Sequence, residues 1–236
     1  MVKLMKITYW SDFACPYCYI GNTRLKKAIK DLNLENEIEF DIRAFELDQN
    51  APQDVESTTV ERFALKYGLS LSDAQRQVDN ISELGIEEGI DFEYASTLYT
   101  NTRDAHRLMK LAQSKNDLEL VENMATLLFD AYFTKNLKLA DKTVLLNVGV
   151  EAGLEKDEIT AVLESDLFDS DVEKDEEIAL TGGIHAVPFY LFDGKYSIPG
   201  ALSYNDFKSV LSQIISETEV EDGKDTDRCE DGVCKI

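Results

Sequence analysis

Four cysteines form two closely spaced pairs that are far apart in the chain. The first pair is a CPYC motif from Cys15 to Cys18, and the second is Cys229 and Cys234, which four residues separate. The thiolate of a cysteine is the nucleophile in disulfide exchange, and a second cysteine nearby resolves the mixed disulfide that forms. We therefore expect redox chemistry at the first pair, with Cys15 as the nucleophile and Cys18 as the resolving thiol.

A zinc site is the alternative for the first pair. Structural zinc takes four ligands, which are commonly Cys and His side chains. The nearest histidine in the sequence is His106, and the other two cysteines lie more than 200 residues away. This spacing favours redox chemistry, and we expect no metal.

The elements around the first pair place it at the start of a helix. Residues 6–10 are β-branched or aromatic for the most part and predict a strand. Apolar residues from Leu25 to Leu32 recur at helical spacing, and residues 38–45 alternate between apolar and polar, which predicts a second strand. The start of a helix carries partial positive charge, which stabilises the thiolate of Cys15.

The rest of the chain is mainly helical. Residues 58–181 carry helical spacing, whereas residues 186–192 and 195–198 predict a hairpin, followed by a final helix. The order β-α-β, helices, β-β-α predicts an α/β fold whose sheet is interrupted by a helical insertion. We expect one discontinuous domain of residues 1–50 and 170–216, an insertion domain of residues 51–169, and a flexible acidic tail of residues 217–236.

Charge and hydropathy exclude several classes of function. The 236 residues carry 24 basic and 46 acidic side chains, for a net charge of −22. Such a chain repels phosphate backbones and anionic membrane surfaces, so we expect no nucleic-acid and no membrane partner. No apolar run has the length of a membrane span, and the first residues lack the pattern of a secretory signal. We therefore expect a cytoplasmic protein.

Four segments carry a resemblance to a known family. Residues 9–21, YWSDFACPYCYIG, resemble the active-site segment of DsbA-like thioredoxin-fold oxidoreductases, above all that of the cytoplasmic FrnE-like branch. Residues 45–52, 101–108 and 183–189 resemble further segments of that branch, so the match covers most of residues 6–216. The resemblance implies a DsbA-like thioredoxin fold with an all-helical insertion domain, and the activity of a thiol–disulfide oxidoreductase or isomerase.

The resemblance also implies a substrate groove. The Val187–Pro188 bond would be cis and would lie beside the first cysteine pair, where Val187 offers its backbone to an extended substrate strand. The residues alone suggest an ordinary trans proline at the start of a strand. Pro16 and Tyr17 would contact the same substrate, a protein or peptide thiol or disulfide. No metal or organic cofactor is implied, and glutathione stays open as a reductant.

Two other functions compete with this interpretation. Kappa-class glutathione transferases and 2-hydroxychromene-2-carboxylate isomerases have a similar architecture and resemble a version with Ser in place of the first cysteine. The presence of both Cys15 and Cys18 favours dithiol chemistry. A redox-regulated chaperone or adaptor, with the acidic tail as its switch, is the non-enzymatic alternative.

The second pair follows a polar and mostly acidic segment. Residues 217–228 predict a flexible linker that could carry Cys229 and Cys234 to the first pair. Members of the FrnE-like branch include proteins with a C-terminal pair at this spacing, which supports a secondary redox role. The alternative is an inert tail.

Overall fold

A four-stranded mixed sheet is the centre of the fold in this computed structural model, which describes residues 4–226. The strand order is β2-β1-β3-β4, with β1 parallel to β2 and antiparallel to β3. The hairpin of β3 and β4 is antiparallel. The strands are β1 (Met5–Ser11), β2 (Ile38–Ala44), β3 (Phe189–Phe192) and β4 (Tyr196–Pro199).

Nine α-helices and one short 3₁₀ helix are present in the described residues. The helix α1 connects β1 to β2, so the predicted β-α-β unit is confirmed. All helices from α2 to α8 lie between β2 and β3 in the sequence, which confirms the helical insertion into the sheet. The helices are α1 (Pro16–Asp31), α2 (Thr59–Tyr67), α3 (Leu71–Glu87), η1 (Tyr94–Ser96), α4 (Arg103–Ser114), α5 (Leu118–Phe133), α6 (Lys142–Ala152), α7 (Lys156–Leu163), α8 (Asp169–Thr181) and α9 (Tyr204–Thr226).

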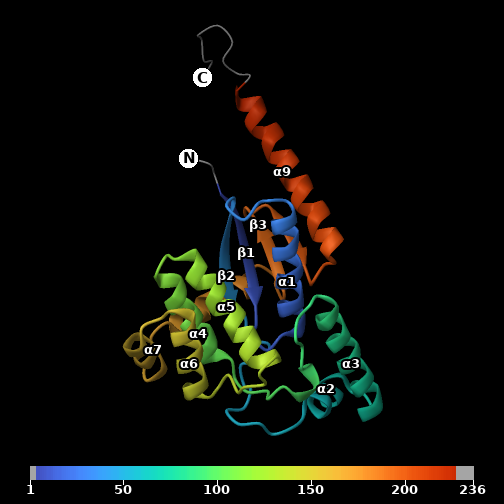
Figure 1. Cartoon of the computed structure of the whole chain (residues 1–236), viewed down its shortest axis with the longest axis vertical. Helices are drawn as coiled ribbons and strands as arrows, with labels where there is room; N and C mark the ends of the chain where they lie inside the picture. The colour runs from blue at the N-terminus through green and yellow to red at the C-terminus, as the bar shows by residue number, and fades with distance from the viewer. Residues whose placement is uncertain (1–3, 227–236) are drawn as a thin grey trace.

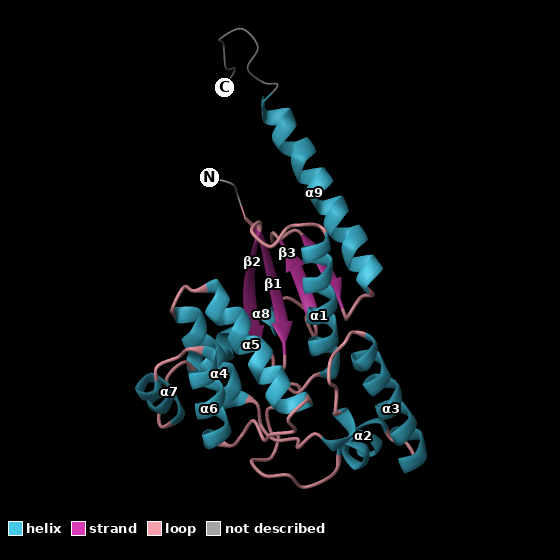
Figure 2. Cartoon of the chain, in the orientation of Figure 1, coloured by secondary structure: helices cyan, strands magenta, loops and turns pink. Residues whose placement is uncertain are grey.

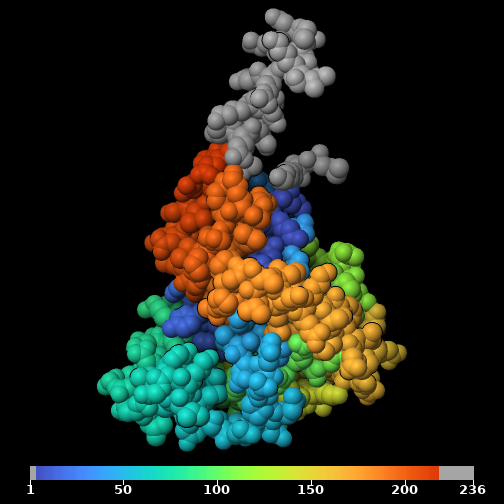
Figure 3. All heavy atoms as spheres, turned by 180° about the vertical axis from the view of Figure 1, so that it is seen from behind, coloured from blue at the N-terminus to red at the C-terminus, as the bar shows by residue number. Residues whose placement is uncertain are grey.

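Successive residues of β1 face opposite sides of the sheet, as a strand requires. Tyr9 stacks on Tyr190 of β3 at 5.6 Å between ring centroids, and Tyr190 meets Phe207 of α9 edge-on at 5.3 Å. Trp10 packs in a separate cluster with Ala179 of α8. Helices α1 and α9 therefore cover one face of the sheet, and α8 covers the other (Figures 1 and 3).

The start of α1 packs closely against the sheet because it carries a glycine. A Cβ atom on Gly21 would lie 2.6 Å from the hydroxyl oxygen of Tyr190 and 3.0 Å from the Cβ atom of Ala201. Any larger side chain would push α1 away from β3. The glycine therefore fixes how deeply the helix that begins beside Cys15 is seated.

The helices α2 to α7 gather at the end of the sheet toward which β1 runs (Figure 2). The loop after β1 reaches into them through Phe13, whose ring lies 5.2 Å from that of Phe129 on α5. The segment that carries the first cysteine pair is thus held between the sheet and the inserted helices. No helix within residues 4–226 has the length and apolar character needed to cross a bilayer.

The prediction of a flexible linker from residue 217 is wrong for residues 217–226, which continue α9 to Thr226. The amphipathic start of α9 is anchored by Phe207, Leu211 and Ile214, which are buried. Extending a helix that has already formed costs far less than starting one, and this segment contains no proline. The second cysteine pair, Cys229 and Cys234, lies outside the described residues.

Candidate active site

The first cysteine pair lies at the start of α1, after the loop that follows β1. Cys15 is the N-cap residue of α1 in an extended backbone conformation, and Pro16 occupies the first helical position. The amide of Cys18 donates to the carbonyl of Cys15 at 3.1 Å, and the amide of Cys15 donates to the carbonyl of Asp12 at 3.0 Å. The structure therefore places Cys15 at the helix start that the sequence predicted, where free amides and partial positive charge gather.

The loop before β3 lies against Cys15. The Val187–Pro188 peptide bond is cis, which confirms the prediction from the resemblance. The sulfur of Cys15 donates to the carbonyl oxygen of Val187 at 3.7 Å. The carbonyl of Pro188 in turn accepts a hydrogen bond from the amide of Gly200 at 2.8 Å, so β4 supports the loop. The structure therefore brings the predicted Cys15, Val187 and Pro188 together.

The two cysteines are free thiols with different surroundings. Both are almost fully buried, with 3% of Cys15 and 1% of Cys18 exposed. Burial raises the pKa of the Cys18 thiol well above its usual range, and the neighbouring Cys15 adds to the rise. Tyr17 between them is 43% exposed and forms the outer surface of the motif. Cys18 therefore stays protonated near neutral pH.

A buried carboxylate lies beside the pair and belongs to Asp12. Its oxygens accept from the amides of Ala14 at 3.1 Å and Leu47 at 2.7 Å. The ring of His106 on α4 places Nε2 at 3.6 Å from Oδ1 of Asp12. Burial alone would raise the pKa of Asp12, but His106 and the two amides outweigh it and lower the pKa. The site therefore contains a buried negative charge with a histidine partner.

The sequence signals suggested only half of this arrangement. Asp12 is adjacent to the motif, whereas His106 is 94 positions further along and starts a helix that looks like an ordinary part of the insertion. In the structure His106 is 2% exposed, and its ring lies 4.9 Å from that of Phe13. The signal available in the sequence was a histidine among the first residues of a predicted helix, and its burial is seen only in the structure. It identifies α4 as the inserted helix that reaches the active-site loop.

A second ionic cluster surrounds Glu46, next to Leu47. The Glu46 carboxylate accepts from Nη1 of Arg103 at 3.0 Å, and Nε of Arg103 donates to Asp169 at 2.7 Å. Burial raises the pKa of Glu46, although Arg103 and His106 oppose this. The cluster ties the segment after β2 to α4 and α8, and so supports the backbone that holds Asp12.

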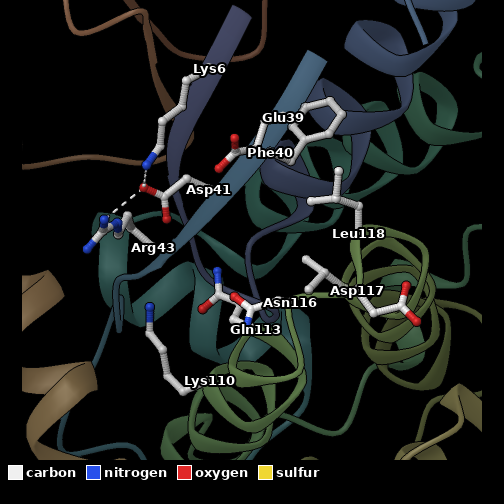
Figure 4. A pocket seen from close by; sticks show the side chains of 11 residues that line it. Lys6, Glu39, Phe40, Asp41, Arg43, Lys110, Gln113, Asn116, Asp117 and Leu118 are labelled. Atoms are coloured by element: carbon white, nitrogen blue, oxygen red, sulfur yellow. Dashed lines mark hydrogen bonds and ion pairs between the residues drawn. The ribbon is translucent and has the colours of Figure 1, made fainter. Parts of the chain in front are cut away.

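A separate hollow lies on the edge of the sheet, between β2 and helices α4 and α5 (Figure 4). Its volume is about 510 Å³. Asp41 pairs there with Lys6 at 2.9 Å and with Arg43 at 2.7 Å. None of the described cysteines lines this hollow, so it is not part of the thiol site. Across residues 4–226, no group of three or more His, Cys, Asp or Glu side chains is arranged to hold a metal ion.

Comparison with known proteins identifies the family. A model of the DSBA-like thioredoxin domain matches residues 6–212. The chain belongs to this family. A probable DsbA oxidoreductase from Streptomyces coelicolor superimposes on this DSBA-like chain with a TM-score of 0.83 at 30% identity, over 90% of this chain and 91% of that one. The Bacillus subtilis protein YwbO is 25% identical over 221 residues, or 87% of this chain and 95% of its own.

More distant structures share the fold. The cytosolic disulfide reductase DsbM from Pseudomonas aeruginosa, solved with glutathione, has a TM-score of 0.60 at 14% identity over 89% of this chain and 99% of its own. A 2-hydroxychromene-2-carboxylate isomerase has a TM-score of 0.63 at 14% identity over 95% of this chain and 100% of its own. The predicted DsbA-like thioredoxin fold with a helical insertion is confirmed, and the chain is a member of a family of thiol–disulfide oxidoreductases.

Proposed function

We propose that this DSBA-like protein exchanges disulfides with peptide and protein substrates through Cys15 and Cys18. One observation carries the proposal. The sulfur of Cys15 is at the start of α1 and also against the carbonyl of Val187, immediately before the cis Pro188. A nucleophilic sulfur thus lies beside backbone that an extended peptide can pair with.

The chemistry is a two-step transfer of two electrons. The thiolate of Cys15 attacks one sulfur of the substrate disulfide, and the other substrate sulfur leaves as a thiolate and takes up a proton. Cys18 then loses its proton and attacks the sulfur of Cys15, which releases the second substrate thiolate. The substrate is reduced to two thiols, and Cys15 and Cys18 become a disulfide. The reverse sequence oxidises a substrate dithiol. Isomerisation results when a different thiolate of the substrate, in place of Cys18, attacks the substrate sulfur of the mixed disulfide, which forms a new substrate disulfide and releases Cys15 as a thiolate.

The remaining roles follow from position. Val187 and Pro188 hold the substrate backbone, while Pro16 and the exposed Tyr17 contact it next to the reacting sulfur. Two glutathione thiols would return the Cys15–Cys18 disulfide to the dithiol and leave as oxidised glutathione. No metal or organic cofactor takes part. We place the protein in the cytoplasm and in the FrnE-like branch.

The presence of Cys18 separates this function from a glutathione transferase or isomerase. A glutathione adduct on Cys15 would be resolved by the neighbouring thiol, so the adduct would not persist. Dithiol exchange is therefore the function that this pair of residues favours.

The test uses a synthetic peptide disulfide and the full chain with Cys229→Ala and Cys234→Ala, so that only the first pair reacts. Cys15→Ala should abolish turnover, whereas Cys18→Ala should accumulate a mixed disulfide with the substrate that is visible by mass spectrometry. Full turnover by the Cys15→Ala variant would disprove the assignment of the nucleophile.

A further inference from the structure

Arg62 differs from the other arginines that the structure describes. It lies on α2, and its guanidinium carbon stacks 3.7 Å from the centre of the Tyr99 ring. Its Nε atom is buried without a hydrogen-bond partner, and within residues 4–226 its guanidinium makes no ion pair. Every other described arginine is paired with a carboxylate; these are Arg24, Arg43, Arg76, Arg103 and Arg107.

This lack of a partner is unusual in a chain with 46 acidic and 24 basic residues. Carboxylates outnumber cations almost two to one, so a guanidinium at a random surface position readily finds one. Tyr99 covers one face of the Arg62 guanidinium and holds it in place, while the Nε edge is already out of water. A guanidinium that is preorganised and partly desolvated binds a planar carboxylate through paired hydrogen bonds.

Arg62 and Cys15 act on the same buried tyrosine. Burial raises the pKa of Tyr94, Arg62 opposes the rise, and Cys15 reinforces it. The hydroxyl of Tyr99, on which Arg62 stacks, contacts Asp48 at 3.4 Å, and the amide of the preceding Leu47 donates at 2.7 Å to Asp12, in the loop before Cys15. Tyr94 belongs to η1, which packs against α2. The unpaired guanidinium therefore lies in the neighbourhood of the proposed nucleophile.

The exposed residue of the cysteine motif points to the same helix. Burial raises the pKa of Tyr17, with contributions from Tyr67 and Cys15. Tyr67 is the last residue of α2 and is 56% exposed. Arg62 lies on the same helix, so this contribution agrees with the placement of α2 near the cysteine motif. No described carboxylate forms an ion pair with this guanidinium, and Asp48 of the same cluster contacts the Tyr99 hydroxyl at 3.4 Å instead.

We propose that Arg62 binds a free carboxylate of the peptide disulfide whose sulfur reacts with Cys15. The inference rests on the proposed function and specifies its substrate as a disulfide that carries a carboxylate within reach of α2. The carboxylate does not react, so it is bound equally before and during exchange. Its contribution then appears in KM and leaves kcat unchanged.

The test compares two synthetic peptides that contain the same intramolecular disulfide and end in either a free carboxylate or an amide. For the unsubstituted protein we expect kcat/KM to be about tenfold higher for the carboxylate, through KM, because hydrogen bonds to charged groups are the strong ones. Arg62→Gln should remove this preference and leave turnover of the amide unchanged. Arg62→Lys should keep part of it, since lysine retains the charge without the planar fork.

Arg76→Gln is the matched control, because Arg76 is an exposed residue of the next helix that pairs with Asp73. It should keep the full preference. Oxidised glutathione and its carboxyl ester give the same comparison for a small disulfide, and so distinguish a small substrate from a longer peptide as the source of the carboxylate.

Equal kcat/KM for the carboxylate and amide peptides, or equal losses on both in Arg62→Gln, would overturn the inference while Cys15-dependent turnover upholds the proposed function. If neither peptide is turned over, the proposed function fails. Calorimetric titration of the reduced peptides then decides the role of Arg62. Equal affinities for the carboxylate and amide peptides would overturn that role, and a preference for the carboxylate peptide that Arg62→Gln removes would support it. The comparison within the unsubstituted protein needs no variant, so it stands even where Arg62→Gln fails to fold.

Discussion

The sulfur of Cys15 donates a hydrogen bond to the carbonyl oxygen of Val187, 172 positions away in the sequence, at 3.7 Å. The contact requires the proton of the thiol. In the proposed function, a thiolate at Cys15 no longer donates to this oxygen, which is then left to accept an amide of the substrate backbone.

The thiol of Cys18 should react only in alkaline solution. Burial and the adjacent Cys15 raise its pKa, so we expect iodoacetamide to leave Cys18 unmodified at neutral pH. Cys15→Ala removes the neighbouring sulfur and should move the labelling of Cys18 to lower pH, though still above that of an exposed thiol. Peptide mapping by mass spectrometry across a pH series measures both. Labelling of Cys18 at neutral pH would contradict the raised pKa of its thiol.

Asp12 should stabilise the fold more at neutral than at acid pH. Its folded pKa is lowered, so its contribution is present above the unfolded value of about 3.9 and is lost as the pH falls through the folded value. Asp12→Asn weakens the bonds to the amides of Ala14 and Leu47 and removes the charge beside His106, which should cost about 1–3 kcal/mol at pH 7. Urea unfolding at pH 7 and pH 3 measures the difference.

The control for this variant is Asp54→Asn, which removes an exposed carboxylate that pairs with Lys138. It should leave the unfolding midpoint nearly unchanged at both pH values. A destabilisation by Asp12→Asn that is as large at pH 3 as at pH 7 would show that the carboxylate charge contributes nothing.

Arg103 should stabilise the fold by pairing with the buried charge of Glu46. The Glu46 side chain is 3% exposed, and burial already raises its pKa. Arg103→Met leaves this carboxylate without its cation, which should cost about 3 kcal/mol at neutral pH. Burial of Glu46 is unfavourable for its ionised form. The loss in the free energy of unfolding should therefore grow as the pH rises through the folded pKa of Glu46, and shrink in acid.

The double variant Arg103→Met, Glu46→Gln removes the charge together with its partner. It should recover most of the stability, as measured by thermal unfolding at pH 5 and pH 8. A double variant that is as unstable as Arg103→Met alone would place the effect in lost packing or in the Asp169 contact.

The sequence predicted what local signals encode. Cys15 at a helix start, the flanking strands and the helical insertion follow from residue spacing over short stretches, and the cis bond at Pro188 followed from the family resemblance. The partnership of Asp12 with His106, and the isolation of Arg62, depend on which distant segments meet, and spacing along the chain does not contain this. The extension of α9 to Thr226 was missed because its acidic composition is that of disordered linkers, whereas a helix anchored by Phe207 and Leu211 carries on through such residues.

The extension of α9 changes what is expected of the second cysteine pair. Cys15 follows the end of β1, while the described end of α9 lies beyond the opposite end of the sheet (Figure 1). The seven residues of β1 alone span about 23 Å. Only two residues lie between Thr226 and Cys229, and the three residue steps that join them reach at most about 11 Å when extended. We therefore expect that Cys229 does not reach the first pair of its own chain while α9 is intact.

We expect the Cys229–Cys234 dithiol of one molecule to reduce the Cys15–Cys18 disulfide of another. The dithiol donates two electrons, becomes a disulfide, and leaves Cys15 and Cys18 as thiols. The observed rate should rise in proportion to protein concentration. To measure this, a chain that has only the first pair is mixed with a chain that has only the second pair, and the rate is compared with that of the full chain. Val220→Pro interrupts α9 within the extension and should add a component of the rate that is independent of concentration, because the nine residue steps from 220 to Cys229 can then extend to about 30 Å. Val220→Ala, which keeps the helix, should not. A concentration-independent rate in the unsubstituted chain would mean that the end of α9 unfolds readily in solution, and no transfer at any concentration would reduce the second pair to an inert tail.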